Sequence, residues 1–360
     1  PNEELVFWVD RQSDRIVVGA KRLATVKDDD DRHNYAYVFY GDTFFDTVKD
    51  PKWSNMGHEM IAFTHYYIVE NGESFYLHAG ESVLIKDFEV PRVRHNYKET
   101  SDDKADWNRL MNAIANGISS GEMTKVVSSR EVEFTSETPY NVASILANLV
   151  DNNPNCFIFG YEKDGRTFVG ASPEILVRHR GSEILSYALA GTAPKDGPNA
   201  WTKEQLLTNT KNIVEHNIVR DRIVNTMKQI TPDVTVGETG IMELSHLYHL
   251  RTIIIAKDST KSLVEWAKIL HPTPALGGEP REKALALLQE YESHERGMYA
   301  APFGFMKDMG DGIVVVAIRS ALIMDNVLYA YAGCGVVADS DADEEYAETN
   351  NKMRTILDAL

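Results

Sequence analysis

Strand-like runs joined by two-residue turns recur along this chain, and long helical patterns stand between them. Two such turns are Asn71-Gly72 and Asp164-Gly165, dipeptides that favour the tight turn of a β-hairpin. Hairpins pair their strands antiparallel, and hairpins separated by long helices predict an α+β architecture. The paired runs that we expect are 61–69 with 74–78, 157–161 with 167–169, and 313–318 with 327–331.

Apolar residues at helical intervals predict three helices, and one polar stretch predicts a boundary. The helices are expected over 107–118, 201–230 and 343–360. Further strands are expected over 35–40 and 125–127. The polar stretch near residue 100 is the only candidate boundary. We therefore interpret the 360 residues as one domain, with an N-terminal β-rich portion over 1–120 and a core over 121–360.

Composition narrows the classes of partner and the compartment. A formal net charge of −17 disfavours nucleic acid and anionic membranes as partners. The chain has no run of about eighteen uncharged apolar residues and no signal-peptide pattern at its start, so we expect a cytoplasmic protein. Cys156 and Cys334 stand far apart in apolar or glycine surroundings and are interpreted as core thiols. Pro1 stands where Met would begin a chain, which suggests a missing upstream segment.

The last helix carries a charged face. Glu345, Glu348 and Lys352 fall at i, i+3 and i+7, so two carboxylates and an ammonium share one side. On spacing alone, a solvated stripe of ion pairs is the commoner interpretation. The segment 331–336 before this helix is a strand running into glycines, whose bare backbone can approach a ligand carboxylate. Together the two segments suggest a metal and anion site.

Glu215 and His216 lie within the predicted helix 201–230. A carboxylate from this second helix could complete the oxygen-rich shell that magnesium prefers. This signal is weak alone, because most helical glutamates are surface charges. His216 is more often a hydrogen-bonded, half-buried residue than a ligand.

Glu174 and Lys125 are the candidates for acid and base chemistry. Glu174 precedes an apolar strand, where burial would raise its pKa and suit a general acid. Lys125 begins a strand, where a partly desolvated amine gives up its proton more readily and can act as a base. The ordinary alternatives are a salt-bridged glutamate and a snorkelling lysine at strand ends.

A small-residue turn and a strand arginine complete the set of candidates. The segment 189–192 supplies a turn with the hydroxyl of Thr192. Arg319 stands on an otherwise apolar run, 317–321, where it needs an anion. Its fork of donors matches a carboxylate bidentately, although a structural aspartate would satisfy it equally well.

In chain order, these motifs resemble those of the chorismate-binding enzyme family, which includes anthranilate, aminodeoxychorismate, salicylate and isochorismate synthases. The resemblance covers roughly residue 125 to the C-terminus, and the N-terminal third only loosely. The segments that carry it are Lys125-Val-Val, Ser172-Pro173-Glu174, Leu189-Ala-Gly-Thr192, Glu215-His216, 271–278, 317–321, 331–335 and 345–352.

Two segments resemble one branch of the family. The segment 271–276, HPTPAL, looks like that of isochorismate synthases, whereas aminating members usually open it with Phe-Pro. The segment 295–302, ERGMYAAP, further resembles the menaquinone-type synthases. The resemblance thus implies a magnesium-dependent isomerase that converts chorismate to isochorismate. It also implies two packed antiparallel sheets with helices outside and the substrate between the halves.

The resemblance also implies a role for each matched residue. Lys125 would activate water for attack at C2 of chorismate, and Glu174 would protonate the departing C4 hydroxyl. Magnesium would be held by Glu215 and Glu348, with Glu345 assisting. The expected substrate contacts are Gly191, Thr192, His249, Ala275, Leu276, Arg319, Tyr331, Gly333, Gly335 and Lys352.

Three alternatives stay open. A salicylate synthase would also make isochorismate and then expel pyruvate on the same site. An aminating synthase would use ammonia or a glutaminase partner, and we expect no obligatory partner of that kind here. A silent chorismate-binding module would keep binding residues without turnover, since a fold does not fix a function. Monomer or weak homo-oligomer is the expected state.

Overall fold

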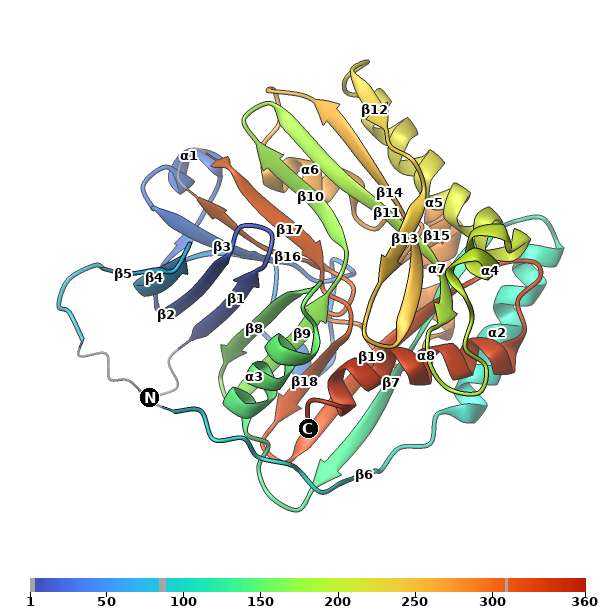
Figure 1. Ribbon diagram of the computed structural model, residues 1–360, viewed down its shortest axis with the longest axis horizontal. Helices are drawn as coiled ribbons and strands as arrows, with labels where there is room; N and C mark the ends of the chain where they lie inside the picture. Colours follow the sequence, from blue (N-terminus) through green and yellow to red (C-terminus); the bar gives the residue numbers. More distant parts are fainter. Residues whose placement is uncertain (1–3, 84–88, 308–309) are drawn as a thin grey trace.

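The computed structural model describes residues 4–83, 89–307 and 310–360. Its strands form two arms of antiparallel ladders that share one strand, β4 (Glu59–Glu70) (Figure 1). One edge of β4 pairs with β2 (Arg15–Val26), and the other edge pairs with β5 (Glu73–His78) and β3 (Tyr37–Gly41). The α+β class is confirmed, and the two expected sheets are continuous with each other through β4.

The first arm runs outward from β2. Each of its strands pairs with the next, and β7 also pairs at its free edge with two short strands, β6 (Tyr97–Glu99) and β15 (Gly278–Glu279). Its strands after β2 are, in spatial order, β1 (Leu5–Asp10), β8 (Phe157–Lys163), β9 (Arg166–Ser172), β18 (Ser320–Met324), β19 (Val327–Val336) and β7 (Lys125–Ser136).

The second arm runs outward from β3. Its last strand, β14, also pairs with the short strands β12 (Val234–Val236) and β13 (Gly240–Glu243). Its strands after β3 are, in spatial order, β16 (Pro302–Lys307), β17 (Gly312–Val316), β10 (Ile175–Arg180), β11 (Glu183–Pro194) and β14 (Leu247–Lys257).

Aromatic side chains pack the two arms against each other. The ring centroids of Phe159 in the first arm and Phe303 in the second lie 4.7 Å apart, and Phe168 packs on Phe159 from β9. Because side chains alternate along a strand, the neighbours Ile158 and Val169 point to the opposite face of the first arm. There they belong to a second apolar cluster with helices α3 and α8.

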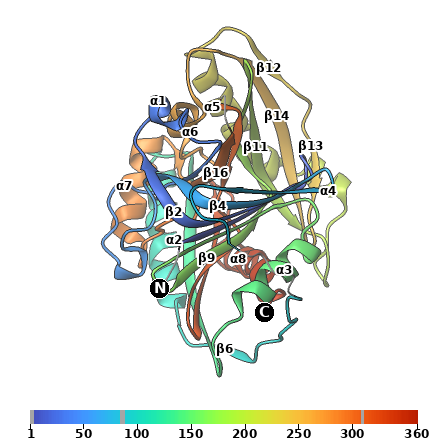
Figure 2. The ribbon, with the colours of Figure 1, turned by 90° about the vertical axis from the view of Figure 1, so that its left-hand side faces the viewer.

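Helices cover the arms on the outside (Figures 1 and 2). α3 packs on β8 and β9, α8 on β18 and β19, and α5 on β11 and β14. Within the described residues, none of the helices combines the length and apolar character needed to cross a lipid bilayer. The helices are α1 (Asp29–Arg32), α2 (Lys104–Ser119), α3 (Val142–Asn152), α4 (Lys203–Thr208), α5 (Thr210–Lys228), α6 (Leu263–Leu270), α7 (Arg281–Tyr291), α8 (Ala342–Leu357) and the 3-10 turn η1 (Pro51–Trp53).

Two expected hairpins are confirmed and one is wrong. β4 pairs with β5 and β8 pairs with β9, each around the expected turn. The run 313–318 does not pair with 327–331, because the chain turns a corner at Arg319, whose φ of 53° lies in the left-handed region. β17 therefore ends before this corner and pairs with β10 and β16, whereas β18 after it makes the hairpin with β19.

The helix expected over 201–230 is two helices. Asn209 interrupts it with an extended backbone and caps α5, its side chain accepting a hydrogen bond from the backbone N–H of Asn212. The helices expected over 107–118 and 343–360 are present as α2 and α8. Cys156 and Cys334 are buried free thiols, as the sequence indicated.

Candidate active site

A cavity of about 50 Å³ lies where the far ends of the two arms face each other. β7 and β19 of the first arm line it, together with β11 and β14 of the second arm and helices α5 and α8. Ten residues singled out from the sequence lie in its wall: Glu174, Thr192, Glu215, His249, Ala275, Leu276, Arg319, Gly333, Gly335 and Lys352.

Lys125 lies directly behind this wall. Its side chain is 0% exposed, and its Nζ is 3.1 Å from Oε1 of Glu215 in α5. The two groups are at ion-pair distance, but their geometry is not that of a hydrogen bond, and Nζ has no hydrogen-bond partner among the described residues. A buried amine without a full set of partners is available to a ligand or to water that enters the cavity.

Glu174 lies immediately before β10 of the second arm, and backbone hydrogen bonds hold it in place. Its N–H donates to Oγ of Ser172 at 3.2 Å, and its carbonyl accepts from the N–H of Val316 at 3.0 Å. Only 3% of the residue is exposed. Burial raises the pKa of Glu174 to about 8, although Lys125, Arg319 and other nearby cations oppose the rise. The carboxyl group therefore keeps its proton near neutral pH, which is the state that a general acid needs.

Arg319 and His249 form a fixed pair beside the cavity. Nη2 of Arg319 donates to Nε2 of His249 at 2.8 Å, so the ring proton lies on Nδ1, which donates to Oγ1 of Thr192 at 3.0 Å. Burial and the charge of Arg319 hold the pKa of His249 well below its ordinary value. The left-handed backbone of Arg319 costs on the order of 1–3 kcal/mol, as is common at functional sites.

Glycines keep the β19 wall open. A Cβ on Gly335 would overlap the Glu215 carboxylate and the Lys125 side chain, and one on Gly333 would lie 2.7 Å from the carbonyl of Ser128. Nζ of Lys352 donates to the carbonyl of Gly333 at 2.8 Å. A side chain at either position would collide with these neighbouring protein atoms, so the packing here requires glycine.

Three carboxylates meet at the edge of the cavity, each facing a lysine. Glu215 faces Lys125, Glu345 pairs with Lys211 at 2.6 Å, and Glu348 pairs with Lys352 at 2.7 Å. Burial and the charge of Glu348 raise the pKa of Glu345 to about 7, although Lys211 opposes the rise.

This donor set has the chemistry that a hard divalent cation prefers. The repulsion among the carboxylates is the kind that a cation relieves. The lysines now supply the compensating charge, and the described residues contain no group of three His, Cys, Asp or Glu at metal-ligand spacing. Oxygen donors of this kind suit a divalent cation, but a bound cation would have to displace the lysine partners.

The structure does not bring every predicted residue to the cavity wall. Tyr331 is buried in the core, where its hydroxyl donates to Oε2 of Glu131 at 2.7 Å. Gly191, with φ of 84°, shapes the bulge of β11 before Thr192. Glu345 and Glu348 stand at the edge rather than in the wall. His216 is a buried structural residue that bonds the carbonyl of Ala190 and the hydroxyl of Thr252.

Sequence reasoning missed several residues of the site. Tyr299 lines the cavity, and the segment 295–302 that contains it had been singled out only as a marker of family branch. Asn212 holds the backbone N–H of Thr192 through its side-chain oxygen, three residues before Glu215 on α5. Lys211 has no motif of its own, and only the fold shows that it reaches Glu345.

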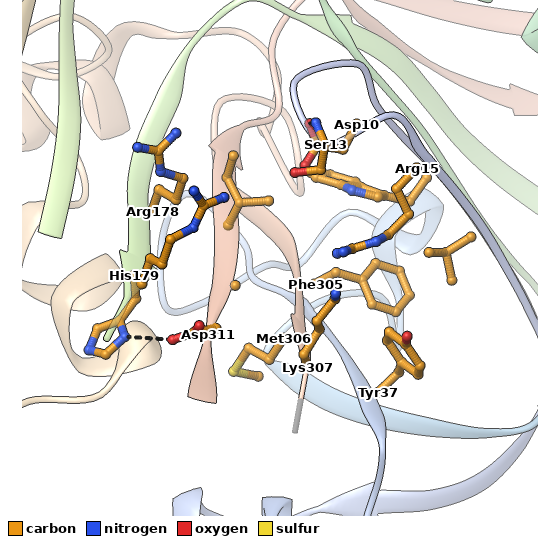
Figure 3. A pocket seen from close by; sticks show the side chains of 15 residues that line it. Asp10, Ser13, Arg15, Tyr37, Arg178, His179, Phe305, Met306, Lys307 and Asp311 are labelled. Atoms are coloured by element: carbon orange, nitrogen blue, oxygen red, sulfur yellow. Dashed lines mark hydrogen bonds and ion pairs between the residues drawn. The ribbon is translucent and has the colours of Figure 1, made fainter. Parts of the chain in front are cut away.

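A second cavity, of about 110 Å³, lies in the N-terminal half of the molecule (Figure 3). We call it the N-terminal cavity; it is lined by residues of β1, β2, β3, β10, β16 and β17, with Trp8 and Phe305 among them. Arg15 and Arg178 stand on its rim, and both are ion-paired with glutamates of neighbouring strands. It holds none of the residues predicted for the site.

Comparison with known proteins agrees with this fold. A model of the chorismate binding enzyme family matches residues 82–360. The isochorismate synthase MenF of Bacillus subtilis is 36% identical over 264 residues, which are 72% of this chain and 56% of that protein. Anthranilate synthase component 1 of Arthrobacter globiformis is 34% identical over 255 residues, which are 68% of this chain and 48% of that protein.

A solved structure shares the whole architecture. MenF, the menaquinone-specific isochorismate synthase from Escherichia coli, matches with a TM-score of 0.83 and 24% sequence identity, covering 98% of this chain and 88% of the other. At this identity the likeness concerns the fold. The family match and the sequence relatives together show that the chain belongs to the chorismate-binding enzyme family. It spans about half the length of the curated relatives named above.

Proposed function

We propose that this protein is an isochorismate synthase that isomerises chorismate to isochorismate. The observation that carries the proposal is a buried carboxylic acid, Glu174, with a pKa of about 8, in the wall of a cavity that also contains Glu215, the partner of the buried Lys125. Acid and base groups of this kind suit the replacement of one hydroxyl by another. The likeness to isochorismate synthases in sequence supports the choice within the family.

In the proposed reaction, water adds at C2 of chorismate as both ring double bonds shift and the C4 hydroxyl leaves. Lys125 takes the proton of the attacking water, and Glu174 gives its proton to the departing hydroxyl, so that water is consumed and released once each. Arg319 and Lys352 bind the pyruvyl carboxylate, with the backbone at Gly333 and Gly335 beside it.

The remaining predicted residues shape the ring pocket. Thr192, His249, Ala275 and Leu276 would contact the ring and fix its orientation. A neutral His249 accepts a hydrogen bond from Arg319, which keeps the guanidinium aimed at the cavity. The structure gives Tyr331 no place in this scheme, because its hydroxyl is committed to Glu131.

Glu215, Glu345 and Glu348 would hold magnesium. The metal would supply positive charge for the ring carboxylate of the substrate. Chorismate would be the only substrate besides water, with no glutaminase partner, and the product would feed menaquinone synthesis in the cytoplasm.

Product analysis tests the function. The protein is incubated with chorismate and magnesium, with and without ammonium, beside a control with EDTA, and the products are separated by chromatography. Isochorismate that forms only with metal is the expected result. Salicylate with pyruvate, an aminated product or unchanged chorismate would replace the proposal with a lyase, an aminating synthase or a silent binder, respectively.

A further inference from the structure

Behind the cavity lies a buried ion pair that the proposed chemistry does not use. The side chains of Glu292 and Arg296 are 2% and 1% exposed, and Nε and Nη2 of Arg296 both donate to the Glu292 carboxylate, at 2.9 and 2.6 Å. Neither residue lines the cavity. A buried pair of this kind is often no more stabilising than apolar packing, so its presence calls for a role in positioning.

The guanidinium reaches two separate walls of the cavity. Nη1 donates to the carbonyl of Leu276 and Nη2 donates to the carbonyl of Val127, both at 2.7 Å. Leu276 belongs to the segment between α6 and β15, and Val127 belongs to β7, two residues after Lys125. Both residues are part of the cavity lining.

The Glu292 carboxylate makes a second contact with β7. Oε1 of Glu292 accepts from the backbone N–H of Ser129 at 3.0 Å and from its hydroxyl at 2.7 Å. The two walls also touch directly, because the N–H of Val127 donates to the carbonyl of Gly277 at 2.9 Å. The pair thus bonds to the backbone on both sides of this contact between the Leu276 segment and β7, which we call the seam. The ring of Phe44 covers the guanidinium at 4.2 Å.

We propose that the Glu292–Arg296 pair is a positioning element that sets the distance between the Leu276 wall and the strand carrying Lys125. Arginine is needed because only its planar fork reaches a carboxylate and two carbonyls at once, which a lysine ammonium cannot. This inference rests on the proposed function for its kinetic consequence, but the geometry of the seam can be tested without turnover.

The test compares Arg296→Lys with a matched control, Arg166→Lys. Arg166 is also largely buried, and its Nη1 donates to the carbonyls of Pro51, Lys52 and Ser54, none of which lines the cavity. Both changes remove guanidinium donors from backbone carbonyls. Glu292→Gln serves as a milder variant that keeps the shape of the side chain, should Arg296→Lys fail to fold.

Steady-state kinetics on chorismate give the first readout. A displaced wall is expected to lower kcat/KM by about 10²-fold in Arg296→Lys, with KM raised, because small misplacements of positioning groups have costs of this size. Simple loss of folded protein would lower kcat and leave KM unchanged. Arg166→Lys should keep the KM of the wild type, and added guanidinium ion should restore part of the activity of Arg296→Ala. A wild-type KM in Arg296→Lys would overturn the proposal.

Amide hydrogen exchange gives the second readout and needs no activity. In Arg296→Lys, exchange is expected to quicken at 125–130 and 275–279, and not there in Arg166→Lys. Unchanged protection in both segments would overturn the positioning role even if the wild type proved inactive on chorismate. An inactive wild type with loosened segments would leave the seam standing and remove only the proposed function.

Discussion

Two of the cavities in the described part of the molecule, the N-terminal cavity and the active-site cavity, lie beside glutamates whose pKa values are shifted in opposite directions. Arg15 in the lining of the N-terminal cavity pairs with Glu70 of β4, and this hydrogen bond is the main cause of a pKa of Glu70 below its ordinary value. In the active-site cavity, burial outweighs the nearby cations and raises the pKa of Glu174 to about 8. Neighbouring charges have the larger effect on Glu70, and desolvation has the larger effect on Glu174.

The comparison indicates that cavity volume alone does not identify the proposed active site. The N-terminal cavity is the larger of the two, about 110 Å³ against about 50 Å³, but its ion pairs are partly exposed and screened by water. The smaller cavity removes Lys125 and Glu174 from water. Glu174, whose pKa burial raises to about 8, can exchange a proton with a substrate near neutral pH.

The largest expected effect is on turnover. Lys125→Ala and Glu174→Gln are each expected to lower kcat for chorismate by about 10³-fold or more, since acid and base act in one displacement. Arg178→Ala on the rim of the N-terminal cavity should leave kcat within about twofold, as a partly exposed pair contributes little. Near-normal turnover in either active-site variant would remove the assigned roles.

The next effect concerns the carboxylates at the cavity edge. Glu348→Gln and Glu215→Gln are expected to weaken magnesium binding and to lower kcat/KM by about 10²-fold, because each removes a charged oxygen donor. Titration calorimetry with magnesium and activity as a function of metal concentration measure the two quantities. Glu70→Gln is the control, and unchanged magnesium affinity in Glu348→Gln would contradict the assignment of the metal site.

The dependence of activity on pH should follow the proton on Glu174. The acid form is needed, so kcat is expected to fall as pH rises through about 8. A pH–rate profile of the wild type measures this limb. A rate that stays level between pH 7 and 9.5 would show that another group supplies the proton.

Stability should respond to pH with opposite signs at the two cavities. The pKa of Glu174 is higher in the folded protein than its usual 4.5, so its contribution is full below pH 4.5 and is lost as pH rises to about 8. Glu174→Gln should therefore gain stability relative to wild type over that window, on the order of a few kcal/mol. Glu70→Gln should lose stability relative to wild type at neutral pH, and this loss should fade in acid, because the pKa of Glu70 is lowered. Urea unfolding at several pH values measures the stability of both variants relative to wild type. The same pH dependence in both variants would contradict the comparison.

The smallest effect is expected at the rim of the N-terminal cavity. Arg178→Ala removes a pair with Glu183 whose side chains are 23% and 34% exposed. Such pairs contribute about 0–1 kcal/mol, so the thermal midpoint should shift by only a few degrees at most. A thermal melt that shows a large loss would mean that this cavity has a structural role that its ion pairs do not indicate.

Local sequence patterns predicted the structural features that depend on residues close together in the sequence. Turn dipeptides gave the hairpins β4–β5 and β8–β9, and the position of Glu174 before an apolar strand gave its burial and raised pKa. The corner at Arg319 could not be predicted from the sequence, because a left-handed backbone at a residue other than glycine is held by the surrounding fold. Because this corner was not foreseen, the predicted pairing of 313–318 with 327–331 was wrong.

Long-range contacts account for the rest. Lys211 and Glu345 are 134 residues apart, and Arg296 reaches Val127 over 169 residues, so no spacing in the sequence joins them. Tyr331 lies on the same face of β19 as Gly333 and Gly335. Its side chain is buried farther along the strand, where the ring stacks on Tyr299 with centroids 5.3 Å apart and the hydroxyl donates to Glu131. A place in the motif therefore does not decide whether a side chain reaches the cavity.

The most direct test of the account is to run the reaction in water enriched in oxygen-18 and to analyse the product by mass spectrometry. If Lys125 activates water for attack at C2 while Glu174 releases the C4 hydroxyl, isochorismate formed early in the reaction carries one solvent oxygen at C2. Isochorismate without the label would mean that the hydroxyl migrates within the substrate, and this would contradict the acid–base mechanism built on the two buried residues.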